Sequence, residues 1–284
     1  SPARFHLSIR LFDCGSSRAA LIPRTHNHAG YPEGVAGSEL LRLMLVQAER
    51  FGAVRETLEV TRVEPLGDGF AVHAGGRTFP ARAVLLATGV VNHRPEGIDG
   101  ALHDAALQRG LLRYCPICDG YEVTDKRIGV IGTGEHGMRE ALFLRGYTSD
   151  VTLIAPGAAH ELDAECAAAL EAAEVIRVDG PCGDYAIEGE RIAVETAAGR
   201  LAFDSIYPAP GPRIRSDLAS AAGAAASKDG CLEVDDHQRT SIPGLFAAGD
   251  VVKGLDQISH AMGEAGVAAT TIRNMLAEQR PIRR

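Results

Sequence analysis

The pattern of apolar and polar residues predicts short strands that alternate with helices and turns. An apolar run at residues 7–12 ends at Asp13, and the run at residues 83–89 closes on a tight glycine turn. Residues 127–131 lead into a glycine-rich turn, and a further apolar run follows at 151–154. The unbroken apolar character of residues 83–89 indicates burial on both faces, as in a parallel sheet.

Helical and alternating patterns fill the segments between these runs. An amphipathic helix is expected from Ser38, a capping residue, to Gly52, which ends it. Residues 54–84 alternate with a period of two around glycine-rich turns, which predicts a small antiparallel meander. The other expected elements are a helix at 163–174, two strands at 191–203, a linker at 206–212, a strand within 240–252 and a helix at 259–275.

Composition narrows the class of protein. A length of 284 residues allows two domains or one large domain. The chain has 32 glycines and only 5% aromatic residues, which favours glycine-turned α/β units over an aromatic-rich β-sandwich. A formal net charge of -8 argues against binding to nucleic acid or to an anionic membrane. Without a membrane-length apolar run, a signal peptide or a paired cysteine framework, the chain is expected to be cytoplasmic.

The clearest candidate for chemistry is a Cys-x-x-Cys pair, Cys115 and Cys118, followed directly by Asp119. In such a pair one thiol attacks and the other resolves the mixed disulfide, while the neighbouring carboxyl group handles the proton. The alternatives are half of a zinc site or two incidental buried cysteines. Zinc needs a second Cys or His pair, and the other cysteines lie singly at positions 14, 166, 182 and 231. His26 and His28 lack a third ligand, so no metal site is predicted.

A second motif is the Gly-x-Gly-x-x-Gly sequence at 132–137, which lies between a predicted strand and a predicted helix. In that context it predicts a dinucleotide-type fold, with glycines that let the backbone approach a pyrophosphate. An NAD site would have an acid at the end of the next strand, and an NADP site a basic residue. Neither follows Ile154, and there is no Lys or Arg between Arg145 and Arg177. Because Glu135 adds a carboxylate inside the turn, an extra phosphate would meet unfavourable charge.

Two acids follow predicted strands. Asp13 occupies the position where the second strand of a dinucleotide-binding unit presents an acid to the ribose, although aspartate is also common in surface turns. The glycine loop that this interpretation requires would lie upstream of Ser1. Asp250 would place a second carboxylate at a strand end, free to accept hydrogen bonds from hydroxyl groups.

Five motifs, in this order and spacing, resemble those of the low-molecular-weight thioredoxin reductase family of FAD-dependent disulfide oxidoreductases. They are residues 27–34, 87–89, 115–120, 132–137 and 242–258. The resemblance covers essentially the whole chain and implies an α/β fold of two Rossmann-like dinucleotide-binding domains with three ββα layers, the second inserted in the first. The FAD-binding domain would comprise residues 1–97 and 205–284, without its N-terminal glycine loop. Residues 98–204 would form the inserted NAD(P)-binding-like domain with the cysteine pair.

The same resemblance implies roles for individual residues. Cys118 would face the flavin, Cys115 would attack a partner disulfide and Asp119 would handle the proton. The implied FAD contacts are Asp13, Asn27, Thr88, Gly89, Gly249, Asp250, Gln257 and Ile258. Within this set, Asp250 would bind the ribityl hydroxyls, and Gln257 and Ile258 would lie against the flavin ring. His260 also falls near the ring, where a polar residue at a helix N-terminus is the alternative interpretation.

The resemblance further implies an enzyme that forms a homodimer and acts on thioredoxin or a similar small dithiol protein. Because the family's basic NADPH signature is absent, NADPH is not predicted as electron donor, and ferredoxin, a second flavin or NADH are left as candidates. An FAD-dependent dithiol oxidase, which runs the chemistry in the other direction and gives electrons to oxygen, is the enzymatic alternative. A redox sensor without turnover is the non-enzymatic one.

Overall fold

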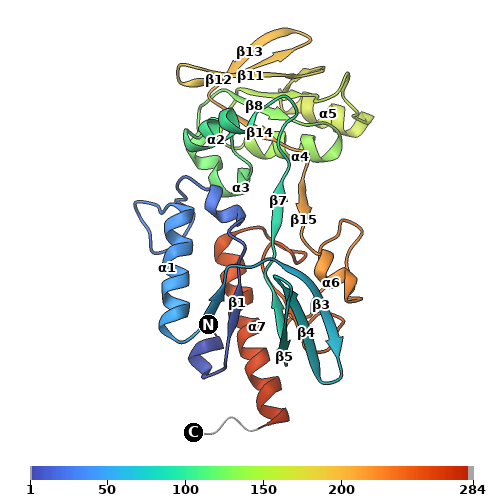
Figure 1. The fold of residues 1–284 in the computed structure, drawn as a ribbon. Coiled ribbons are helices and arrows are strands. Elements are labelled where there is room, and N and C mark those ends of the chain that lie inside the picture. Colours follow the sequence, from blue (N-terminus) through green and yellow to red (C-terminus); the bar gives the residue numbers. More distant parts are fainter. Residues whose placement is uncertain (1, 281–284) are drawn as a thin grey trace. The chain divides into compact units, whose positions relative to one another are not determined.

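The computed structural model describes residues 2–280 as an α/β protein (Figure 1). The chain divides into two compact units. The terminal unit comprises Ser1–Ala20, Ser38–Val91 and Ile214–Arg284, and the central unit comprises Leu21–Gly37 and Asn92–Arg213. Each unit has its own hydrophobic core, and the two are described in turn.

A four-stranded parallel sheet forms the middle layer of the central unit. Its strands, in spatial order, are β10 (Ile176–Val178), β9 (Val151–Ile154), β8 (Ile128–Ile131) and β14 (Ser205–Pro208). Strands β8, β9 and β14 are buried along their whole length, as expected for a parallel sheet covered on both faces.

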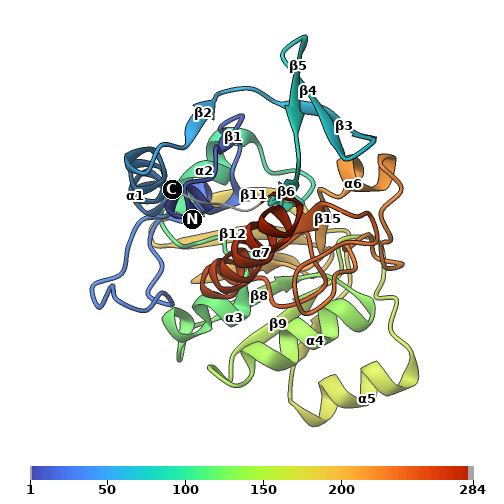
Figure 2. The same ribbon diagram turned by 90° about the horizontal axis from the view of Figure 1, so that it is seen from below.

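Side chains alternate between the two faces of this sheet and build two cores. Ile131 and Ile206 face an antiparallel sheet, whereas Val130 and Tyr207 face helices. Figure 2 shows these two layers on opposite sides of the parallel sheet. The antiparallel sheet consists of β11 (Gly183–Glu188), β12 (Arg191–Thr196) and β13 (Gly199–Phe203). The helices of the opposite layer are α4 (Gly134–Leu144) and α5 (Ala164–Ala172). The central unit therefore has the predicted ββα layers, and α2 (Gly100–Gln108), α3 (Pro116–Asp119) and the 3-10 turn η3 (Gly120–Val123) complete it.

The terminal unit repeats this layering around shorter parallel pairs. Strand β16 (Leu245–Ala247) pairs with β6 (Val84–Leu86), and β1 (Arg10–Phe12) pairs with β2 (Val54–Glu56). One face of the β6 and β16 pair packs on a meander, and the other packs on the long helix α7 (Ile258–Gln279). The meander consists of β3 (Val60–Leu66), β4 (Gly69–Ala74) and β5 (Arg77–Ala81). The remaining elements are η1 (Pro2–Phe5), η2 (Arg18–Leu21), α1 (Gly37–Arg50), β7 (Val90–Asn92), β15 (Pro212–Ile214) and α6 (Asp217–Ala221).

The expected linker at residues 206–212 is wrong in its first half, because β14 is a buried strand. Proline is tolerated at 208 because the backbone nitrogens of residues 206 and 208 face away from β8, and a proline nitrogen has no hydrogen to donate. The Ile206 N–H donates to Leu111 on the other side, whereas the Ala209 N–H donates to Ile131 in β8. Pro208 therefore removes no hydrogen bond from the ladder with β8.

The expected meander at residues 54–84 begins later than predicted, because residues 54–56 form β2 beside β1. The helix predicted at 38–52 forms as α1, Gly37–Arg50, so Ser38 lies inside its first turn and is not the predicted cap. Gly52, with a φ of +90°, lies two residues beyond its last residue. Within residues 2–280, none of the helices combines the length and the apolar character that a membrane span requires.

Candidate active site

The cysteine pair belongs to a single-turn helix of the central unit. Pro116 takes the first helical position of α3, where its missing N–H costs nothing, and Cys115 precedes it. The N–H groups of Cys118 and Asp119 donate to the Cys115 carbonyl oxygen over 2.9 and 3.2 Å. This turn brings residues three apart together, and Cys115 and Cys118 are joined in a disulfide with their Cα atoms 5.2 Å apart. Both cysteines are partly exposed.

Asp119 is held by two side chains from outside the motif. Nη1 of Arg113 lies 2.9 Å from Oδ2 of Asp119, and the Tyr207 hydroxyl donates to Oδ1 over 2.9 Å. Burial raises the pKa of Asp119 because the charged form loses hydration, whereas Arg113 and Tyr207 act in the opposite direction. With 26% of its side-chain surface exposed, the carboxyl group can still exchange protons with water.

Tyr114, directly before the pair, belongs to a buried polar chain. Its hydroxyl lies 2.9 Å from Nε2 of His103, whose Nδ1 lies 3.0 Å from Oδ1 of Asp104. His103 is on α2 and is almost completely buried. Burial raises the pKa of Tyr114 to about 12, so its hydroxyl stays protonated near neutral pH. This chain fixes the segment that enters the cysteine pair.

Accessible apolar side chains accompany the disulfide. Ile117, between the cysteines, is 45% exposed, and Tyr121 is 81% exposed. Tyr147 packs against the backbone of Gly120, so that the segment after Asp119 has a fixed support. The disulfide thus lies among groups that a large substrate can reach.

In the terminal unit, four predicted residues meet at the ends of two paired strands. Strand β6 leads to Thr88 and Gly89, and β16 leads to Gly249 and Asp250. Because these strands are parallel, their carboxyl ends share one edge, which is where ligands bind in open α/β sheets. The Thr88 hydroxyl donates to the carbonyl of Arg215 over 2.6 Å. The four residues predicted from the sequence therefore lie at the same edge of the paired strands.

Asp250 is placed to accept hydrogen bonds from a ligand rich in hydroxyl groups. Its carboxylate is 21% exposed and lies 3.0 Å from Nη1 of Arg18. Gly249 adopts a φ of +78°, and its N–H donates to Glu264 of α7 over 2.6 Å, which fixes the turn. Burial and the neighbouring Asp250 carboxylate raise the pKa of Asp256 to about 6. These residues fit the ribityl chain of a flavin, because carboxylate oxygens accept hydroxyl hydrogen bonds.

The other predicted cofactor residues lie on different elements. Gln257 and Ile258 open α7, and His260 lies one turn further along it, paired with a glutamate at 3.0 Å. Asp13 ends the other parallel pair, after β1, and accepts a hydrogen bond from a backbone N–H two residues on. Asn27 belongs to the segment 21–37 of the central unit. Asp13 and Asn27 therefore belong to other parts of the fold than the strand-end group.

The Gly-x-Gly-x-x-Gly sequence forms the predicted turn between β8 and α4. A side-chain carbon on Gly137 would lie 2.9 Å from the carbonyl carbon of Gly132, so a larger residue would force strand and helix apart. Gly134 opens the helix with a φ of +62°. This is the geometry expected of a dinucleotide-type turn.

Comparison with known proteins agrees with this arrangement. The family model described as pyridine nucleotide-disulphide oxidoreductase matches residues 31–265. The chain belongs to this family. It is 32% identical to a thioredoxin reductase of Mycolicibacterium smegmatis, a match that covers 98% of this chain and 91% of the relative. It is 30% identical to a thioredoxin reductase of Listeria innocua, over 89% of this chain and 80% of the relative.

Solved structures of this oxidoreductase family share the fold. The crystal structure of HlmI matches with a TM-score of 0.86 and 31% identity, covering 98% of this chain and 87% of HlmI. A thioredoxin reductase from Streptococcus pyogenes matches with a TM-score of 0.88 at 24% identity, covering 98% and 92%. The protein is therefore an oxidoreductase enzyme and a flavoprotein of the thioredoxin reductase type, with two Rossmann-like domains.

The glycine turn of this oxidoreductase has polar partners within the central unit. The loop after β9 lies against the turn, because the Glu161 N–H donates to the Thr133 hydroxyl over 2.6 Å. The carbonyl oxygen of Glu161 would be 3.5 Å from a side-chain carbon on Gly134. The cation on the first turns of α4, Arg139, is already paired with Glu135. The turn is therefore anchored to the loop that follows β9, and the Arg139 guanidinium is already paired.

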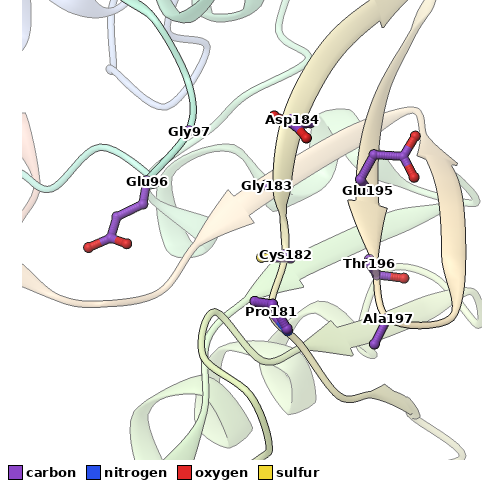
Figure 3. A pocket seen from close by; sticks show the side chains of 9 residues that line it. All are labelled: Glu96, Gly97, Pro181, Cys182, Gly183, Asp184, Glu195, Thr196 and Ala197. Atoms are coloured by element: carbon purple, nitrogen blue, oxygen red, sulfur yellow. The ribbon is translucent and has the colours of Figure 1, made fainter.

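A separate hollow in the central unit contains the thiol of Cys182. Its volume is about 400 Å³, and it is lined by the acidic residues Glu96, Asp184 and Glu195 (Figure 3). The side chains of Glu96 and Glu195 point in different directions in Figure 3. Burial raises the pKa of Cys182, so this thiol is a poor nucleophile near neutral pH. Among residues 2–280, no group of three or more His, Cys, Asp or Glu side chains is arranged to hold a metal ion.

Proposed function

We propose that this enzyme passes two electrons between FAD and the Cys115–Cys118 disulfide, and exchanges them with a thioredoxin-like dithiol protein. The observation that carries the proposal is the oxidised pair on α3 with the carboxyl group of Asp119 held beside it. A bound flavin supplies the two-electron chemistry that connects the disulfide to a donor or acceptor. The relatives named thioredoxin reductase support thioredoxin or a similar small protein as partner.

The proposed reaction at the cysteine pair is thiol–disulfide exchange. Reduction adds two electrons and two protons to the disulfide and leaves two thiols. The Cys115 thiolate then attacks one sulfur of a partner disulfide, and the other partner sulfur leaves as a thiolate that takes up a proton. Cys118 attacks the Cys115 sulfur, which re-forms the disulfide and releases the second partner thiol. Asp119 holds or delivers the proton at Cys118, the sulfur proposed to face the flavin.

The flavin is proposed to be FAD, bound by the terminal unit. Its contacts would be the predicted residues, and Asp250 would take the ribityl hydroxyls, because its carboxylate is partly exposed at a strand end. The predicted division assigns residues 1–97 and 205–284 to this domain and 98–204 to the inserted one. Because β14 pairs with β8 in the central sheet and residues 21–37 and 92–97 belong to the central unit, we propose the terminal unit as the FAD-binding domain and the central unit as the inserted one. By the same reasoning from the family, the enzyme is proposed to work as a cytoplasmic homodimer.

The electron donor is proposed not to be NADPH. The loop after β9 contacts the glycine turn at Thr133, and the chain has no Lys or Arg between Arg145 and Arg177 to bind a 2′-phosphate. Ferredoxin, a second flavin and NADH are the alternatives. In a stopped-flow comparison of NADPH, NADH and reduced ferredoxin, we expect NADPH to bleach the flavin slowly or not at all. Rapid bleaching by NADPH would overturn this proposal.

A dithiol oxidase is the second candidate, and the same lack of a Lys or Arg for a 2′-phosphate favours it. An enzyme without a nucleotide donor can take electrons from a dithiol substrate through Cys115 and Cys118 and give them to oxygen. Oxygen consumption with small dithiols that is lost in Cys115→Ser would support the oxidase. Reduction of thioredoxin without oxygen consumption would support the reductase. Membership in an enzyme family argues against a redox sensor without turnover.

A further inference from the structure

We propose that Arg113 and Tyr207 are positioning residues that fix the direction of the Asp119 carboxyl group beside the disulfide and, through it, govern proton exchange with the sulfur atoms. This inference rests on the proposed role of Asp119 in the proposed function. Neither residue belongs to the Cys-x-x-Cys motif, and each contacts a different oxygen of the carboxyl group.

A second contact, to the backbone of Gly110, anchors the guanidinium group of Arg113. Its Nε donates to the Gly110 carbonyl over 3.1 Å, while its Nη1 contacts Oδ2 of Asp119, and only 18% of the side chain is exposed. A guanidinium group anchored at one nitrogen presents the next nitrogen in a fixed direction, since the group is planar. Arg113 thus places one positive charge at one oxygen of Asp119.

Tyr207 approaches from the sheet. It lies in β14, is completely buried, and donates its hydroxyl to Oδ1 of Asp119 over 2.9 Å. Burial, with a further effect of the Asp119 carboxylate, raises the pKa of Tyr207, so the phenol keeps its proton and remains a donor. Because β14 is a rigid strand of a parallel sheet, it fixes the plane of the carboxyl group.

The contacts with Arg113 and Tyr207 affect the pH at which Asp119 loses its proton. Burial and the like charge of Glu122 raise the pKa of Asp119, and the charge of Arg113 and the hydrogen bonds from Arg113 and Tyr207 lower it. During reduction of the disulfide by an external dithiol, the attacking thiolate forms a mixed disulfide and one protein sulfur leaves as a thiolate. A protonated Asp119 supplies the proton that this sulfur needs, and water restores it afterwards.

The test follows reduction of the Cys115–Cys118 disulfide in the full chain by dithiothreitol, using quenched thiol alkylation and mass spectrometry. Rates are measured from pH 5 to 9 and divided by the concentration of the dithiothreitol thiolate. In the wild type we expect this normalised rate to fall as Asp119 loses its proton. Asp119→Asn should remove that step and lower the normalised rate at low pH at least tenfold, because proton transfer by a positioned group contributes about 10²-fold or more.

Arg113→Gln and Tyr207→Phe should each move the step to higher pH, since each removes a contact that lowers the pKa of Asp119. Arg113→Lys should restore most of the wild-type profile by keeping the charge. In the Asp119→Asn background, neither substitution should change the rate profile. Arg109→Gln is the matched control, because Arg109 is a cation four residues away whose guanidinium group contacts the Gly189 carbonyl and the Glu190 carboxylate.

An unmoved step in both Arg113→Gln and Tyr207→Phe would overturn the inference, as would an equal move in Arg109→Gln or in the Asp119→Asn background. Tyr207→Phe keeps the ring in the core, so the test stands even where Arg113→Gln fails to fold. The assay needs neither flavin nor partner. Failure to bind flavin or to reduce thioredoxin would therefore count against the proposed function alone.

Discussion

Buried carboxyl groups are the residues of this protein whose chemistry depends most on their neighbours. Asp119 has a cation and a phenol at its two oxygens, whereas Asp256 has Asp250 and Arg18 nearby, with an Arg18 contact of 3.7 Å. Burial raises the pKa of both acids, and a neighbouring carboxylate adds to the effect in each case, Glu122 at Asp119 and Asp250 at Asp256. We expect pH to act through Asp119 on the reactivity of the disulfide and through Asp256 on the stability of the folded protein.

Asp256 is expected to make the folded protein less stable as pH rises through the weakly acidic range. Its pKa is about 6 in the folded protein against an ordinary value of 3.8, so the folded state binds more protons between these values. The contribution of Asp256 to the free energy of unfolding is therefore complete below about pH 4 and disappears as the pH rises through about 6. Thermal melting of Asp256→Asn should show a smaller loss than the wild type between pH 4 and 7.

Asp68→Asn, in an exposed turn of the terminal unit, is the control for this measurement. It should follow the wild-type dependence of melting temperature on pH. Parallel curves for the wild type and Asp256→Asn would show that Asp256 does not carry the effect.

The sequence identified the residues that are adjacent in a motif, but not those that fold beside them. Cys115, Cys118 and Asp119 lie so close together in the sequence that their spacing predicts their chemistry. Arg113, two residues before the pair, could have been found from its position alone. Tyr207 could not, because 88 residues separate it from Asp119 and it lies in a proline-rich run that favours a linker.

At the scale of elements, the one-turn helix α3 depends on the glycine that follows it. A side-chain carbon on Gly120 would lie 2.6 Å from Cε2 of Tyr147, and the ring has α4 and its own packing partner Phe143 beside it. The helix and the ring can approach each other only because position 120 has no side chain. This contact supports the segment that carries Asp119.

Gly120→Ala is therefore expected to lower the unfolding free energy by about 1–3 kcal/mol, the usual cost of adding a methyl group where no space exists. Urea unfolding of the full chain measures this cost. Gly183→Ala is the matched control, since a side-chain carbon there meets no atom within 4 Å, and it should change stability by less than about 0.5 kcal/mol. Equal stability of the two variants would contradict the account of this contact.

Elements with strong local signals were predictable, and those defined by distant pairing were not. The turn from β8 into α4 has glycines whose spacing specifies it, and α1 has an amphipathic sequence and a glycine with positive φ two residues beyond its end. Strand β2 alternates like the meander that follows, and only its partner β1 shows that it belongs to a parallel pair. Strand β14 was hidden by Pro208, which the sheet tolerates because its nitrogen faces away from β8.

At the scale of the whole molecule, both units use the same ββα layering for different tasks. The terminal unit collects glycine and carboxylate groups at the carboxyl ends of β6 and β16. The central unit carries the disulfide, and its glycine turn contacts the loop that follows β9. Family membership makes the chain a flavoprotein oxidoreductase.

The central claim is that electrons pass between the flavin and the Cys115–Cys118 pair. The most direct test mixes the flavin-loaded full-length protein with a small dithiol under anaerobic conditions and follows the visible flavin absorbance. We predict that the wild type loses this absorbance, whereas Cys118→Ser binds the same amount of flavin and keeps it oxidised over the same time. Bleaching of Cys118→Ser at the wild-type rate would contradict the account.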